Sequence, residues 1–61
     1  MFRIGQRFYD ERNGRYLTID GVGSDPKCYR CIQEEVNDND ELETTDTVLM
    51  MQCELSKMME A

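Results

Sequence analysis

The chain has 61 residues, with 13 Asp and Glu against 7 Lys and Arg and no His, so its formal net charge is −6 at pH 7. This length allows one domain, residues 1–61, whose core is too thin to give up the roughly 300 Å³ or more that a substrate pocket takes. Because His is the commonest general acid–base and the commonest metal ligand, its absence also argues against catalysis. We therefore expect no enzyme, no catalytic residue, no cofactor and no metal.

Two features bear on where the protein acts. The N-terminus begins directly in structured-looking sequence, without the charged and apolar regions of a signal peptide, and no apolar run approaches the ~20 residues of a membrane span. Three Cys, an odd number, fit a reducing compartment better than a secreted disulfide scaffold. These features predict a cytoplasmic protein with no membrane partner.

The first expected element is a strand over residues 2–9. Its side chains alternate between apolar and polar, with Phe2, Ile4 and Phe8 on one face, which is the pattern of a half-buried strand. Residues 10–14 then supply turn chemistry, because Asn-Gly tolerates the positive φ of a tight hairpin. We expect a β-hairpin to start here.

The return strand covers residues 15–22. Leu17 and Ile19 share its buried face, while Val22 falls out of phase with them. The phase change predicts either a bulge at Gly21 or the end of the strand.

A second turn at residues 23–26 leads into a third strand over residues 27–36. Two short connections between three strands predict an antiparallel meander. Alternation places Cys28, Arg30 and Ile32 on one face, and Tyr29, Cys31 and Gln33 on the other.

The remaining chain is expected to form a loop and a helix. Residues 37–41 are a polar, acidic break, and residues 42–44 suit a brief fourth strand. From residue 48 the apolar side chains fall within a stripe of about 100° on a helix, which favours one C-terminal helix. Other apolar side chains lie outside that stripe, so a short strand over residues 47–50 with a later helix start stays an open alternative. The stripe consists of Val48, Met51, Leu55, Met58 and Met59.

These elements predict a small α+β fold, an antiparallel β-meander of three to four strands with one C-terminal helix. A strongly bent meander of this length can also close toward a small SH3-like barrel. That resemblance is to a general pattern over residues 2–36 and carries no function by itself. The expected core consists of Phe2, Ile4, Phe8, Leu17, Ile19, Ile32 and Leu55.

Cys28 and Cys31 have the C-x-x-C spacing of metal and redox sites. A zinc site needs four ligands, and only Cys53 remains to join them. In a strand, residues three apart face opposite ways, so we interpret the pair as two unrelated thiols and expect neither zinc nor a Cys28–Cys31 disulfide.

The charge is unevenly distributed along the chain. Residues 1–32 hold six cations and four anions, while residues 33–61 hold one cation and nine anions. Acidity of this kind keeps a small protein soluble, and it also attracts basic surfaces and repels phosphate. The carboxylates proposed to bind a basic protein partner are Glu34, Glu35, Asp38, Asp40, Glu41 and Glu43.

Three tyrosines, Tyr9, Tyr16 and Tyr29, fall on the predicted non-core faces of three adjacent strands with Arg side chains between them. This pattern describes an ordinary sheet surface, a protein interface, or a surface that stacks bases and grips phosphates. Because the second half of the chain is strongly acidic, nucleic acid is the least favoured ligand.

We interpret the sequence as a non-enzymatic protein-interaction module that docks an acidic surface and a Met-rich helix on a basic or apolar partner. The apolar excess of that helix also allows a homodimer through it. By size and charge alone, the chain is comparable to phage and mobile-element inhibitors that mimic nucleic-acid charge, anti-CRISPR proteins among them. The alternative is a small β-barrel that binds nucleic acid through its Tyr/Arg sheet face.

Overall fold

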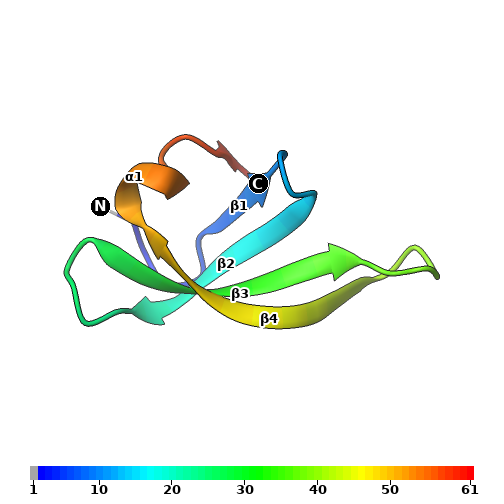
Figure 1. Cartoon of the computed structure of the whole chain (residues 1–61), viewed down its shortest axis with the longest axis horizontal. Coiled ribbons are helices and arrows are strands. Elements are labelled where there is room, and N and C mark those ends of the chain that lie inside the picture. Colours follow the sequence, from blue (N-terminus) through cyan, green and yellow to red (C-terminus); the bar gives the residue numbers. More distant parts are fainter. Residues whose placement is uncertain (1) are drawn as a thin grey trace.

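A computed structural model describes residues 2–61 as a five-stranded antiparallel sheet with one short helix. The strand order is β4-β3-β2-β1-β5, and the sheet is open, with β4 at one edge and β5 at the other (Figure 1). The predicted antiparallel meander is therefore confirmed: its fourth strand is longer than expected, and a fifth strand pairs beside the first. The elements are β1 (Arg7–Asp10), β2 (Arg15–Val22), β3 (Cys28–Val36), β4 (Leu42–Met51), α1 (Gln52–Leu55) and β5 (Met59–Glu60).

The first strand is shorter than the alternation predicts. Residues 3–6 form a turn in which Gly5 has a φ of 93°, and the Gly5 N–H donates to the Ile19 carbonyl at 2.8 Å. The turn leaves Ile4 71% exposed, so its predicted burial is wrong. Phe2 is only half-buried, with its ring edge-on to Phe8 at a centroid distance of 5.1 Å.

The predicted bulge in β2 is confirmed, because the β2–β3 register shifts between Ile19 and Gly21. In β3 the predicted alternation groups the residues correctly, but the predicted buried face is the wrong one. Ile19 pairs with Cys31, which puts Cys31 and Tyr29 on the core face and leaves Ile32 on the outer face opposite Thr18. Both faces of β3 carry apolar residues, so the pairing register, rather than the alternation, decides which face is buried.

The segment expected to be a long helix is mostly strand. β4 runs to Met51, and α1 holds only Gln52–Leu55, with no side-chain cap at its start. The run of Thr and Val residues before α1 favours extended backbone, and pairing with β3 buries Met50. The alternative with a strand at residues 47–50 is confirmed, and the Met-rich helix is wrong because α1 contains no Met.

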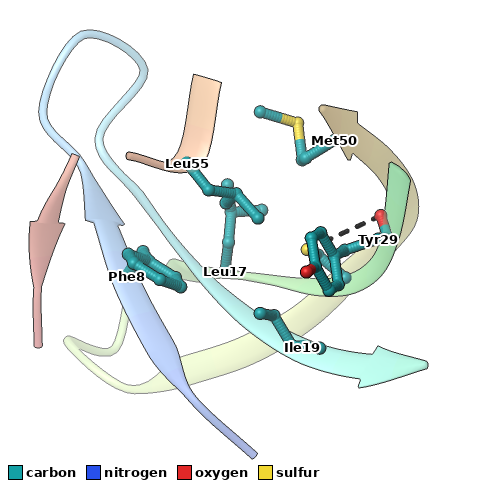
Figure 2. Close-up of a cluster of buried hydrophobic side chains, with 7 residues drawn as sticks. Phe8, Leu17, Ile19, Tyr29, Met50 and Leu55 are labelled. Carbon is teal, nitrogen blue, oxygen red and sulfur yellow. Dashed lines mark hydrogen bonds between the residues drawn. The ribbon is translucent and has the colours of Figure 1, made fainter. Parts of the chain in front are cut away.

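The core fills the concave side of the bent sheet. Leu55 reaches from α1 toward Leu17 and is fully buried, so the single helical turn closes the core (Figure 2). Burial of Phe8, Leu17, Ile19 and Leu55 confirms four of the seven core predictions. Within residues 2–61, no helix has the length and apolar character that crossing a bilayer requires. The buried cluster consists of Phe8, Leu17, Ile19, Tyr29, Cys31, Met50 and Leu55.

Candidate functional site

The most distinctive surface is the far end of the β3–β4 hairpin, residues 34–44, which we call the acidic arm. β2 pairs with β3 only as far as Glu34, so beyond this point β3 and β4 pair with each other alone. The arm therefore projects from the body of the sheet along the 37 Å long axis of the molecule (Figure 1). A two-stranded ribbon of this kind has water on both faces and no core of its own.

The turn that closes the arm is well defined. The side-chain oxygen of Asn37 accepts hydrogen bonds from the main-chain N–H groups of Asn39 at 2.9 Å and Glu41 at 3.0 Å. Asp40 adopts a left-handed φ of 62°, a conformation that Asp and Asn reach more easily than most residues. The polar loop expected at residues 37–41 is confirmed, and its sequence holds it in one shape.

All six carboxylates predicted to bind a partner lie in this arm. Within residues 2–61, Glu34 alone among them forms an ion pair, with Arg7 at 3.5 Å. Glu35 accepts hydrogen bonds from Gln33 at 2.9 Å and from Thr45 at 3.0 Å. The other four are exposed to solvent: Asp38, Asp40, Glu41 and Glu43.

The pairing within the arm opposes like charges. Glu35 lies directly across from Glu43, and residues 31–56 contain eight carboxylates and no Lys or Arg. Like charges in directly opposed positions destabilise a strand pair. A basic group bound from outside would relieve this repulsion, because the chain supplies none along this stretch.

The arm also carries apolar side chains that sequence reasoning missed. Val36 pairs with Leu42, and these side chains are 55% and 44% exposed. The sequence does contain a signal for this apolar surface, because an apolar residue flanks the acidic loop on each side. A basic partner would therefore meet apolar as well as charged surface here.

A chain of polar contacts anchors the arm to the body. Arg15 donates to Asp10 at 2.8 Å and to Gln33 at 2.6 Å, and Gln33 donates to Glu35 and to Thr45. Burial by itself would raise the pKa of Asp10, but the hydrogen bonds from Asn13 and Arg15 and the Arg15 charge outweigh it and hold the pKa below its ordinary value. Asp10 thus stays ionised and keeps Arg15 in place.

The predicted three-tyrosine face is wrong for one of its members. Tyr9 and Tyr16 pack together on the outer face with ring centroids 4.9 Å apart, but Tyr29 is buried in the core. The guanidinium of Arg7 lies 4.5 Å from the Tyr16 ring centre and also meets Glu34. The remaining cluster is partly buried, and its cation forms an ion pair with Glu34, although within residues 2–61 the Nε and Nη2 atoms of Arg7 have no hydrogen-bond partner.

The cysteines lie as two unrelated thiols on opposite faces of β3, as predicted, although their sides are exchanged. Cys31 is buried and Cys28 half-buried, and both are free thiols. Burial, with a smaller contribution from Cys28, raises the pKa of Cys31 to about 11, so this thiol is neutral and unreactive at neutral pH. No group of three or more metal-binding side chains gathers among residues 2–61.

A cleft of about 590 Å³ lies between the β1–β2 turn and the segment around α1. Its lining combines Met50 and Met58 with the opposite charges of Arg12, Lys57 and Glu54. Mixed charge favours neither an anion nor a cation, so this cleft is a weaker candidate than the arm.

Comparison of the chain with protein-family models, curated proteins and solved structures finds no match.

Proposed function

We propose that this protein is a non-enzymatic interaction module that binds a basic protein partner through the acidic arm. The observation that carries the proposal is the arm itself: a projecting ribbon with six carboxylates, no cation and one like-charged pair, Glu35 opposite Glu43. Charges of this kind speed association with an oppositely charged surface more than they strengthen the final complex. Val36 and Leu42 add apolar contact on the other face of the same ribbon.

Binding of this kind also fits an inhibitor that occupies a basic groove on a nucleic-acid-binding protein. The carboxylates of the arm would take the places of phosphates along such a groove. The bent sheet supports a second, finer proposal, that the fold is an open variant of the SH3-like barrel, because β5 returns to pair with β1 and begins to close the meander.

The first experiment replaces all six arm carboxylates by their amides. We expect this variant to fold and to lose most of the partner captured by the parent chain from cells of the source organism. With the captured partner purified, stopped-flow mixing should show slower association and a flatter dependence on ionic strength. Equal rates and equal salt slopes for both chains would overturn the proposal.

A matched pair of variants controls for net charge. Asp38→Asn with Glu41→Gln removes two charges from the arm, while Glu11→Gln with Glu54→Gln removes two from exposed positions outside it. The arm variant should slow association, and the outside variant should change it much less. Equal slowing would mean that overall charge, rather than the arm, attracts the partner.

The alternative of nucleic-acid binding rests on the Tyr9–Tyr16–Arg7 cluster. The Arg7 charge is shared with Glu34 at 3.5 Å, and the arm begins at that residue, so a phosphate chain approaching the cluster would meet repulsion. A gel shift with single-stranded and duplex DNA at low and high salt separates the two functions. Steeply salt-dependent binding of DNA would favour the alternative.

A further inference from the structure

The long edge of the sheet carries unused main-chain hydrogen-bonding groups. β4 is an edge strand of ten residues, and within residues 2–61 no strand pairs with its outer side (Figure 1). An open edge of this length is a template for another strand. At the opposite edge, β5 has only two residues and offers far less.

Two hydrogen bonds fix which residues of β4 face the open side. At one end of the β3–β4 pair the Gln52 N–H donates to the Lys27 carbonyl at 2.7 Å, and at the other the Asn37 N–H donates to the Glu41 carbonyl at 2.8 Å. In an antiparallel pair every second residue bonds to the neighbouring strand and the residues between turn outward. Counting from both ends, the outward residues are Leu42, Thr44, Thr47, Leu49 and Met51. The outward N–H of Thr47 already donates to the side-chain oxygen of Asp46 at 2.8 Å, so its amide is not a free donor.

The outward groups fall into two stretches of different chemistry. The register shift at Thr45 interrupts the ladder. The outward residues Thr47, Leu49 and Met51 therefore form one continuous run on the C-terminal side of the shift. Leu49 is 64% exposed and Met51 39% exposed, which makes this run apolar. On the other side of Thr45, the edge belongs to the acidic arm.

Residues 47–51 of this edge lack the devices that usually prevent pairing, because the register shift and both charged residues of β4 precede them. β4 contains no Lys, Arg, Pro or Gly, and its charged residues are Glu43 and Asp46. A second copy of this chain is a poor occupant, because β4 would meet another strand from a stretch that has no cation. A strand with apolar residues at one end and Lys or Arg at the other complements both stretches.

We propose that β4 binds an extended segment of a basic partner protein by strand addition, with the apolar part of the segment along residues 47–51 and its basic part along the arm. Antiparallel addition, the commoner arrangement, requires the apolar residues to come first in the segment and the basic residues after them. This inference rests on the proposed function, since the same arm attracts the partner, and it adds how the partner is held.

The test uses a synthetic ten-residue peptide with Val, Ile and Thr alternating in its first half and four Lys in its second half. Amide hydrogen exchange of the protein is measured by NMR with and without this peptide. In the free protein the Leu49 and Met51 amides should exchange fast, while those of Val48 and Met50 are protected. Saturating peptide should slow the Leu49 and Met51 amides by at least about tenfold, because each gains a hydrogen bond.

Two N-methylated versions of the peptide separate strand addition from charge attraction. Methyl groups on the amides that face β4 should weaken binding by at least about tenfold, and the same number on the amides that face away should change it by less than about threefold. Both versions keep every side chain and every charge. If they bind equally well and remain salt-dependent, the arm attracts a basic partner but strand addition is wrong.

Leu49→Pro tests whether the main-chain groups of β4 bind the peptide. The Leu49 N–H faces outward, so proline removes a binding group without breaking a bond to β3, and edge strands tolerate proline at such positions. The variant should fold and lose peptide binding, with Leu49→Ala as the control that keeps the N–H and retains most of it. Protection of the Leu49 and Met51 amides in the peptide-free parent at high protein concentration would instead show that a second copy covers the edge.

Discussion

The body of the sheet and the acidic arm use the same two strands in opposite ways. In the body, β3 lies between two neighbours, and Tyr29 and Cys31 are buried in the core. In the arm, the same strand has one neighbour, its side chains meet water, and Glu35 lies opposite Glu43. The buried apolar side chains that stabilise the fold lie in the body, whereas the arm carries carboxylates that repel one another.

This difference assigns separate tasks to the two regions. Stability in so small a protein depends on a few buried side chains, each of which matters, because those buried among residues 2–61 form one cluster. The arm adds a cost through repulsion and offers exposed groups to a partner. Changes in the body should therefore act on folding, and changes in the arm should act on binding.

The largest expected effect is in the body. Phe8→Ala removes a ring that is 3% exposed and contacts Phe2, so the free energy of unfolding should fall by about 3–5 kcal/mol, comparable to the whole stability of a chain this size. Val36→Ala, its counterpart in the arm, should cost less than about 0.5 kcal/mol. Urea unfolding followed by circular dichroism compares the two, and equal losses would contradict the division.

The connection between the regions comes next. Arg15→Met leaves the buried Asp10 without its charged partner and should lower the free energy of unfolding by about 2 kcal/mol. Arg12→Met, in the exposed turn beside it, should change stability by less than about 0.5 kcal/mol. Denaturant unfolding of both variants measures the difference. If Arg15→Met unfolds like the parent, the polar chain does not hold the arm to the body.

Acid should weaken the same connection. The pKa of Asp10 is lower in the folded protein than in the unfolded chain, so this carboxylate stabilises the fold above its unfolded pKa and the contribution is lost as pH falls through the folded pKa. Asp10→Asn should reduce stability at neutral pH and flatten its decline toward acid. Denaturant unfolding over a pH series measures this effect. Asp38→Asn, in the arm, is the control and should keep the parent slope.

The smallest expected effect is a gain in stability, whereas the changes above lower the free energy of unfolding. Glu43→Thr replaces one member of the like-charged pair by a β-branched residue, which should stabilise the arm by about 0.2–1 kcal/mol. Slower amide exchange at the main-chain bonds between residues 35 and 43 would report it. An unchanged or faster exchange rate would show that repulsion across this pair is not a cost. The same substitution should weaken attraction to a basic partner.

Local patterns predicted the strands well and the assignment of faces less well. The alternation of residues 15–22 and the misfit of Val22 located both β2 and its bulge, because those signals lie within one strand. The buried face of β3 depends on pairing with β2, which no single-strand pattern contains. Helical spacing from Val48 was misleading, because β4 continues the ladder with Cys31 and Tyr29 and tertiary pairing overrides a weak helical period.

The candidate site was predicted in its charges and missed in its shape. The six carboxylates are adjacent in sequence, so any hairpin at residues 37–41 brings them together. That the hairpin projects beyond β2 follows from strand lengths, which the sequence patterns define only loosely. Tyr29 lies in the core because pairing with β2 decides the buried face of β3, and alternation within the strand does not contain that information.

The way the arm is closed has a consequence for how this protein can change over generations. Asn37 and Asp40 hold the turn with their own local hydrogen bonds and backbone shape, so residues 38–43 contribute no side chain to the buried cluster. Natural selection can therefore alter the tip one substitution at a time while the chain continues to fold. A recognition element built in this way can follow a partner that is itself evolving to escape it.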